Sequence, residues 1–177
     1  DKEKEVTDEL RKAKRDNDEV VKEIEKESRR LLEEVKETVK RDKKVLRELE
    51  EEVKEAKKKN VSEDLVEKLL RKWEKVSKEL KDRHRRLIEE WDKVTKELEK
   101  KSRKIIDENR KILKRIADRG VDKKVLDEIR KVLTEAKKMH DDVLRRDREV
   151  LETARKLSED SKKENEDVLR KVAEELR

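Results

Sequence analysis

Asp42, His84 and Ser161 carry the three side chains that a hydrolytic Ser-His-Asp triad requires. That chemistry needs a base within hydrogen-bond reach of the hydroxyl, a carboxylate that orients the base, and backbone N–H groups that stabilise an oxyanion. When the expected helices are aligned by depth, as described below, these three side chains fall at one level, so the first two requirements can be met. The third has no source, because no Gly-rich turn or free backbone N–H falls in the middle of a long helix. We therefore predict no catalytic residues and no enzyme activity.

Metal binding is the second chemistry that these side chains suggest. The chain has no Cys and two His, and neither His84 nor His140 belongs to a Glu-x-x-His motif of the kind found in di-metal bundles. The same alignment separates the two imidazoles by about 25 Å along the helices, so they cannot share an ion. We predict no metal, no cofactor and no small-molecule substrate.

The composition indicates a restricted alphabet. Of the 177 residues, 60% are charged and 30% are hydrophobic; Pro, Cys, Phe, Tyr and Gln are missing and Gly occurs once. Such a chain is disordered unless its apolar residues are strictly periodic. No apolar run approaches the roughly 20 residues of a membrane span, and no signal peptide is seen. We expect a soluble protein, with no contact to a membrane.

The net charge of +6 comes from residues 61–120, while the flanking thirds are balanced. Even in that middle third, acidic and basic residues alternate. A nucleic-acid surface needs a basic stripe, whereas alternating charges are typical of solvated helix faces with i,i+4 pairs. We therefore expect no nucleic-acid partner.

Two turn signals divide the chain: Asn60-Val61-Ser62 and Gly120-Val121-Asp122. Asn and Gly tolerate the left-handed conformation that ends a helix, Ser and Asp are good N-caps, and each Val can pack against the residue four positions after the cap. The sequence thus predicts helices at about 3–59, 63–119 and 123–175. Short turns make neighbouring helices antiparallel, so we expect one domain spanning 1–177, running up-down-up.

An eighteen-residue period runs through these helices. Residues 69–80 read LLRKWEKVSKEL and residues 87–98 read LIEEWDKVTKEL, and in the last helix Ile129, Asp147 and Asn165 occupy one column. Eighteen residues make five whole turns, combining a seven-residue repeat with an eleven-residue repeat whose supercoils have opposite hands. We predict an all-α fold: a straight up-down-up antiparallel three-helix bundle with long helices of roughly 85 Å and an 18-residue repeat.

Polar residues interrupt the inward-facing columns, and buried polar groups must be hydrogen-bonded. Placing residue i of the first helix level with about 121 − i in the second and 120 + i in the third groups them into layers. Asn17 falls near Ser102 and His140. Asn165 falls near Trp73 and Ser77, and Asn109 is placed beside Thr134. The predicted structural network comprises Asn17, Ser28, Thr38, Asp42, Trp73, His84, Trp91, Ser102, Asn109, His140, Asp147, Ser158, Ser161 and Asn165.

Within these layers, Ser28 is expected beside Trp91 and Asp147, whose carboxylate suits an indole N–H. Thr38 and Asp42 are expected near His84, Ser158 and Ser161. Burial should lower the pKa of His140. A nearby Asp42 should hold the pKa of His84 level or raise it.

The matched turns, the eighteen-residue columns, the missing residue types and the polar residues at core positions together resemble parametrically built, de novo designed helical bundles with buried hydrogen-bond networks. The resemblance covers the whole chain. It implies a hyperstable coiled-coil scaffold with no natural biochemical function, located in the cytoplasm of an expression host. Among natural proteins, the pattern is closest to a rod or stalk module.

The width of the apolar stripe leaves the oligomeric state open. Inward doublets such as Leu31-Leu32 and Ile105-Ile106 suit helices that each touch two neighbours in a self-contained monomer. They also suit a groove that receives a partner helix or a second copy of the chain. We expect a monomer, with a designed binding module as the alternative.

Overall fold

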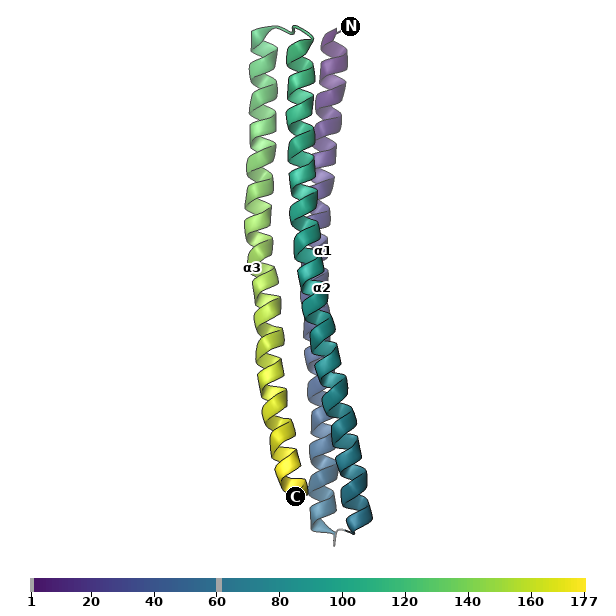
Figure 1. Ribbon diagram of the computed structural model, residues 1–177. Coiled ribbons are helices and arrows are strands. Elements are labelled where there is room, and N and C mark those ends of the chain that lie inside the picture. The colour runs from purple at the N-terminus through teal and green to yellow at the C-terminus, as the bar shows by residue number, and fades with distance from the viewer. Residues whose placement is uncertain (1, 60–61) are drawn as a thin grey trace. The chain divides into compact units, whose positions relative to one another are not determined.

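The computed structural model describes residues 2–59 and 62–177, which form three long helices and, within these ranges, no strand (Figure 1). Helix α1 spans Lys2–Lys58, α2 spans Glu63–Asp118 and α3 spans Lys123–Leu176. Each boundary lies within one residue of the predicted one. The all-α three-helix prediction is confirmed, because good helix formers fill the elements and the breakers stand only between them.

The turn after α2 has the predicted chemistry. Gly120 has a φ of 71°, which is the left-handed conformation, and its N–H donates to the carbonyl of Ala117 over 3.2 Å. Before α2, the Ser62 hydroxyl accepts the N–H of Leu65 at 3.3 Å, as an N-cap does. Asn60 and Val61, the other predicted residues of that turn, lie outside the described residues.

The chain divides into two compact units, each built from one segment of every helix. Unit 1 contains the chain up to Arg30 together with Lys93–Leu151, and unit 2 contains Leu31–Asp92 together with Glu152–Arg177. The single straight domain stays a prediction. Within unit 1, contacts from α1 to α2 run in opposite chain directions and contacts from α1 to α3 run in the same direction. The segments therefore have the up-down-up arrangement.

Each unit has its own apolar core. In unit 1, Val6, Ile116, Ile129 and Leu133 form one cluster, against which Val121 packs. Unit 2 contains two clusters, one around Val35 and Leu87 and a larger one of Leu46, Leu49, Val53, Ala56, Leu69, Val76, Leu80, Leu169 and Val172. These residues recur every three or four positions, so each helix presents one apolar stripe to its neighbours.

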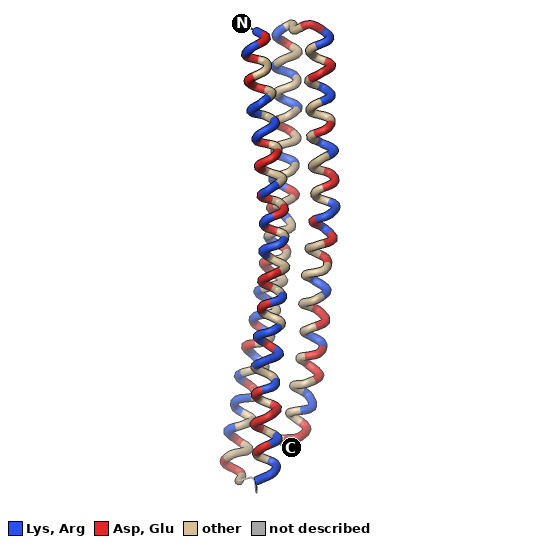
Figure 2. The backbone as a smooth tube through the Cα atoms, turned by 180° about the vertical axis from the view of Figure 1, so that it is seen from behind, with Lys and Arg blue, Asp and Glu red and all other residues tan. Residues whose placement is uncertain are grey.

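Charged residues of both signs are interspersed along all three helices (Figure 2). Many form i,i+3 or i,i+4 pairs, such as Arg145–Asp142 at 2.7 Å and Arg155–Glu159 at 3.1 Å. Pairs of this kind contribute about 0.2–0.5 kcal/mol each to an exposed helix. No helix in the described part of the chain combines the length and apolar character that crossing a membrane requires.

Candidate functional site

In unit 1, three buried polar side chains meet, one from each helix. Asn17 and Asn109 exchange two hydrogen bonds, each amide donating to the other's oxygen over 2.9 Å. His140 Nε2 lies 2.8 Å from Asn17 Oδ1, and Asn17 Nδ2 also donates to the Ala13 carbonyl. All three polar residues are at most 5% exposed. Asn17 is thus the centre of a buried amide–imidazole cluster.

The partner of His140 fixes its tautomer. A carbonyl oxygen only accepts, so Nε2 carries the proton that the Asn17 oxygen receives. Burial lowers the pKa of His140, while Asp141 and Asp18 act in the opposite direction. The predicted direction is therefore confirmed. Ser102, about two turns before Asn109 in α2, is also buried. Neither its hydroxyl nor His140 Nδ1 has a hydrogen-bond partner among the described residues.

The α2 member of this cluster differs from the predicted one. The 121 − i alignment placed Asn17 beside Ser102 and Asn109 beside Thr134, but Asn109 pairs with Asn17 and Thr134 is exposed. Side chains lean toward the N-terminus of their own helix. In an antiparallel pair the two leans are opposed, so facing side chains belong to residues offset along the chain. In the parallel α1–α3 pair both side chains lean in the same direction, so no offset arises. The predicted placement of His140 level with Asn17 is therefore correct.

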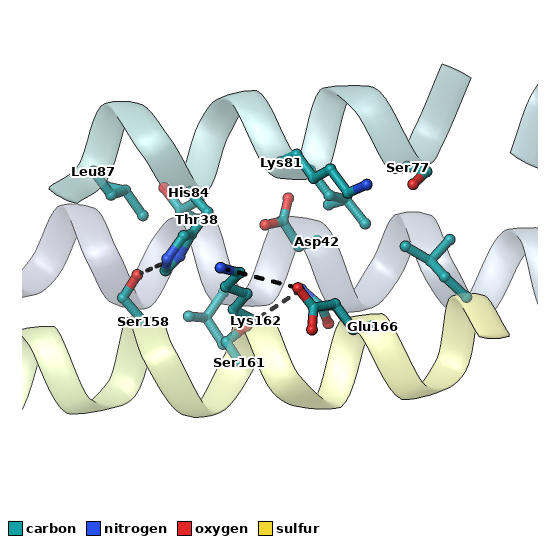
Figure 3. A pocket seen from close by; sticks show the side chains of 14 residues that line it. Thr38, Asp42, Ser77, Lys81, His84, Leu87, Ser158, Ser161, Lys162 and Glu166 are labelled. Atoms are coloured by element: carbon teal, nitrogen blue, oxygen red, sulfur yellow. Dashed lines mark hydrogen bonds and ion pairs between the residues drawn. The ribbon is translucent and has the colours of Figure 1, made fainter. Parts of the chain in front are cut away.

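In unit 2 the polar residues of the predicted layer form two separate pairs, of which Figure 3 shows His84 with Ser158. Arg83 Nε donates to Asp42 Oδ1 over 2.8 Å, and Arg83 Nη2 lies 2.7 Å from the same oxygen. His84 Nδ1 lies 3.0 Å from Ser158 Oγ. Asp42 therefore neutralises a guanidinium and does not orient the imidazole. The predicted proximity of Asp42 to His84 is confirmed, because both line one cavity, but the carboxylate of Asp42 pairs with Arg83 and the imidazole of His84 with Ser158.

This pairing also changes the electrostatics of His84. Burial lowers its pKa and Lys162 adds to that effect, with Glu159 and Glu166 opposing it. The expectation that Asp42 would hold this pKa level or raise it is therefore wrong. The pKa of Asp42 is itself raised by burial, against the attraction of Arg83.

The remaining polar residues of this layer bond locally. Thr38 Oγ1 donates to the Glu34 carbonyl one turn earlier, and Asn165 Nδ2 donates to Ser161 Oγ over 3.4 Å. Together with Asp42 and His84 they line a cavity of about 30 Å³. Such a volume suits one or two water molecules. It is too small for an organic substrate, and Ser161 is bonded to Asn165 rather than to the imidazole.

The two Trp residues behave differently. Trp73 Nε1 donates over 2.7 Å to the Leu169 carbonyl of α3, so its hydrogen-bond partner is a main-chain group. Ser77 and Asn165 line one cavity, as the predicted layer requires. Trp91 lies beneath Arg155, whose guanidinium carbon is 4.7 Å from the ring centroid. Its predicted contact with Asp147 would join residues of different units and stays a prediction.

Ser28 and Asp147 are buried in unit 1, as the alignment indicated. Ser28 Oγ lies 3.1 Å from the Glu25 carbonyl oxygen, which shares the single hydroxyl proton of Ser28 with Asp147. Burial raises the pKa of Asp147, and a hydrogen bond from Ser28 opposes that shift. The second carboxylate oxygen of Asp147 has no hydrogen-bond partner among the described residues. This pair joins α1 to α3 within the unit.

Arg83 is the functional residue that the sequence pattern missed. It precedes His84 and lies on the flank of α2 that faces α1. An Arg at such a position is ordinarily interpreted as a solvated surface residue. Allowing for the opposed side-chain leans would have placed it opposite Asp42. Among residues 2–59 and 62–177, no group of three or more His, Asp or Glu side chains could hold a metal ion.

No protein-family model matches the chain, and no curated protein matches it. A search of solved structures finds similarity to a "Computationally designed three helix bundle", with 20% sequence identity and a TM-score of 0.32. The match covers 98% of this chain and 86% of the other. Because the TM-score is low, the fold assignment rests on the helices and contacts described above.

Proposed function

We propose that this protein is a designed structural scaffold that presents three helices in a fixed register and has no natural biochemical activity. The observation that carries this proposal is the Asn17–Asn109–His140 cluster, in which Asn17 of α1 hydrogen-bonds in the core to one polar residue from each of the other two helices. The restricted alphabet and the eighteen-residue columns support a designed origin.

The cluster specifies register by penalising the alternatives. Sliding α1 by one turn would bring Ala13 or Val21 to the position of Asn17. The Asn109 amide and the His140 N–H would then be buried without partners, which costs about 1–3 kcal/mol for each group. An apolar core of similar shape would tolerate such a slip more readily, because methyl groups make no directional bonds. Buried polar groups that select one register are known from coiled coils.

Hydrogen exchange on the chain alone tests the scaffold proposal. We expect the main-chain amides in the middle of α1, α2 and α3 to exchange slowly in both units, and sedimentation to give the mass of one chain. Rapid exchange throughout α1 or α3, with protection appearing only after a partner is added, would contradict a self-sufficient scaffold.

A second candidate function is a helix-binding module, favoured by the groove between α1 and α3 in unit 1. Leu10, Val132, Ala136 and Met139 line this groove, which has a volume of about 360 Å³. Across the α1–α2 face, by contrast, the ion pair Arg119–Glu9 bridges the two helices. An amphipathic helix fits an apolar groove of this kind.

A synthetic peptide with the sequence of residues 93–118 is a suitable probe, because this segment already packs against α1 and α3 within the chain. A helix-binding module should bind the labelled peptide saturably. Met139→Glu should abolish that binding, while Lys138→Glu at the neighbouring exposed position should not. Equal binding by both variants, or none by the parent, would reject the second candidate.

A further inference from the structure

The net charge of the chain is concentrated on one stretch of one helix. Residues 93–119 contain 11 basic and 5 acidic residues, whereas the rest of the chain contains 45 of each. Every one of these residues belongs to unit 1. Residues 62–92 are neutral overall, so the excess positive charge of residues 61–120 lies entirely in the second half of that range.

The basic residues in this stretch are also ordered by helix face. At 100° per residue, seven of them fall within a sector about 100° wide on the side of α2 opposite its buried residues Val94, Leu98 and Ile105. Glu97, Asp107 and Asp118 share the sector, so its net charge remains positive. The seven, called the lysine face below, are exposed along about 33 Å of helix: Lys93, Lys96, Lys100, Lys104, Lys111, Lys114 and Arg115.

Ion pairing separates the lysine face from the other basic residues of the stretch. The other four are all paired: Lys101 with Glu23, Arg103 with Glu99, Arg110 with Asp107 and Arg119 with Glu9. Within the described ranges, no member of the lysine face lies within ion-pair distance of a carboxylate. Its seven cations therefore have no direct ion-pair partner in these ranges, although the three carboxylates in the sector reduce the net charge of the lysine face to +4.

We propose that the lysine face of unit 1 binds the phosphate backbone of duplex DNA without sequence preference. Six of its seven members are Lys, a flexible point charge that suits phosphate oxygens. The array is linear, like a phosphate strand, and it carries no aromatic side chain that could stack on bases. Binding of this type is driven by counterion release and depends steeply on salt. This proposal revises the expectation, drawn from alternating charges along the sequence, that the chain has no nucleic-acid partner.

The test measures fluorescence anisotropy of a labelled duplex of about 30 base pairs at several salt concentrations. If between four and five of the cations contact phosphates, the slope of log K against log salt should be about −4. Affinity should then fall by about 250-fold when salt rises from about 50 to about 200 mM. Two duplexes of unrelated sequence should bind equally well.

A pair of charge-matched variants isolates the lysine face. Lys100→Gln, Lys104→Gln and Lys111→Gln together should make the slope shallower by between about 2 and 3. The control replaces Lys68, Lys75 and Lys78, which are exposed in the neutral part of α2, with Gln. Its slope of log K against log salt should stay clearly steeper than that of the first variant. Circular dichroism melts verify that both variants fold.

Equal slopes for these two variants would overturn the assignment to this face. Tighter binding of a sulfated polysaccharide than of the duplex at the same salt would overturn the assignment to DNA.

Discussion

Replacing Asn17 with Leu should destabilise unit 1 strongly, because Asn17 serves both other members of the cluster. The substitution removes the acceptor of Asn109 Nδ2 and His140 Nε2, and it removes the donor to Asn109 Oδ1. Three buried polar atoms are left without partners. At about 1–3 kcal/mol for each, with some relaxation, the free energy of unfolding should fall by about 3–6 kcal/mol. Leu has the same branching of side-chain heavy atoms as Asn and is not smaller, so little of this loss comes from a cavity.

Guanidinium denaturation followed by circular dichroism measures the change as a shift of the midpoint at constant slope. The control is a triple variant in which Asn17, Asn109 and His140 all become Leu. Replacing every partner with an apolar group removes the unsatisfied atoms, so this variant should recover most or all of the lost stability. An Asn17→Leu protein as stable as the parent would refute the reasoning, because it would mean that the cluster is solvated or absent.

Four further predictions follow from the same geometry. Burial lowers the pKa of His140, so the unfolded chain takes up the proton more readily and stability should fall as pH drops below about 6.5; His140→Asn should reduce that loss in denaturant melts at pH 7 and pH 5. The pKa of His84 is lowered as well, so His84→Asn should change the acid response in the same direction but less, because His84 is only half-buried. Arg83→Met leaves Asp42 buried without its cation and should raise the pKa of that carboxyl further, visible as a shifted carboxyl titration by NMR. Trp73→Phe loses the hydrogen bond to the α3 main chain and should cost about 1 kcal/mol, whereas an unchanged midpoint would show that water replaces the indole N–H.

The helices could be predicted closely from the sequence because their signals are local. Gly120 ends α2 through its own backbone freedom, and Ser62 caps the next helix through its own hydroxyl. The apolar columns likewise follow from helical geometry alone. These features need no knowledge of how one helix lies against another, which is why each helix boundary lies within one residue of its prediction.

The polar contacts were harder to predict because they depend on the offset between helices. An error of seven residues, or about two turns, replaces Asn109 with Ser102 as the partner of Asn17, although both are buried on the same face. Long side chains add to the difficulty: Arg83 reaches Asp42 from the flank of α2 and displaces His84 from it. Patterns of burial identify which polar residues lie inside, but the choice among neighbouring partners is decided by side-chain reach and competition between donors.

The protonation state of His140 tests most directly the claim that buried polar residues lock the three helices together. Two-bond ¹H–¹⁵N NMR spectra distinguish the two neutral imidazole tautomers. We predict that near pH 7 His140 is neutral, carries its proton on Nε2, and shows that proton as a slowly exchanging signal close to the Asn17 side chain. A rapidly exchanging His140 signal, a proton on Nδ1, or a titration at the ordinary pKa of about 6.5 would contradict the account.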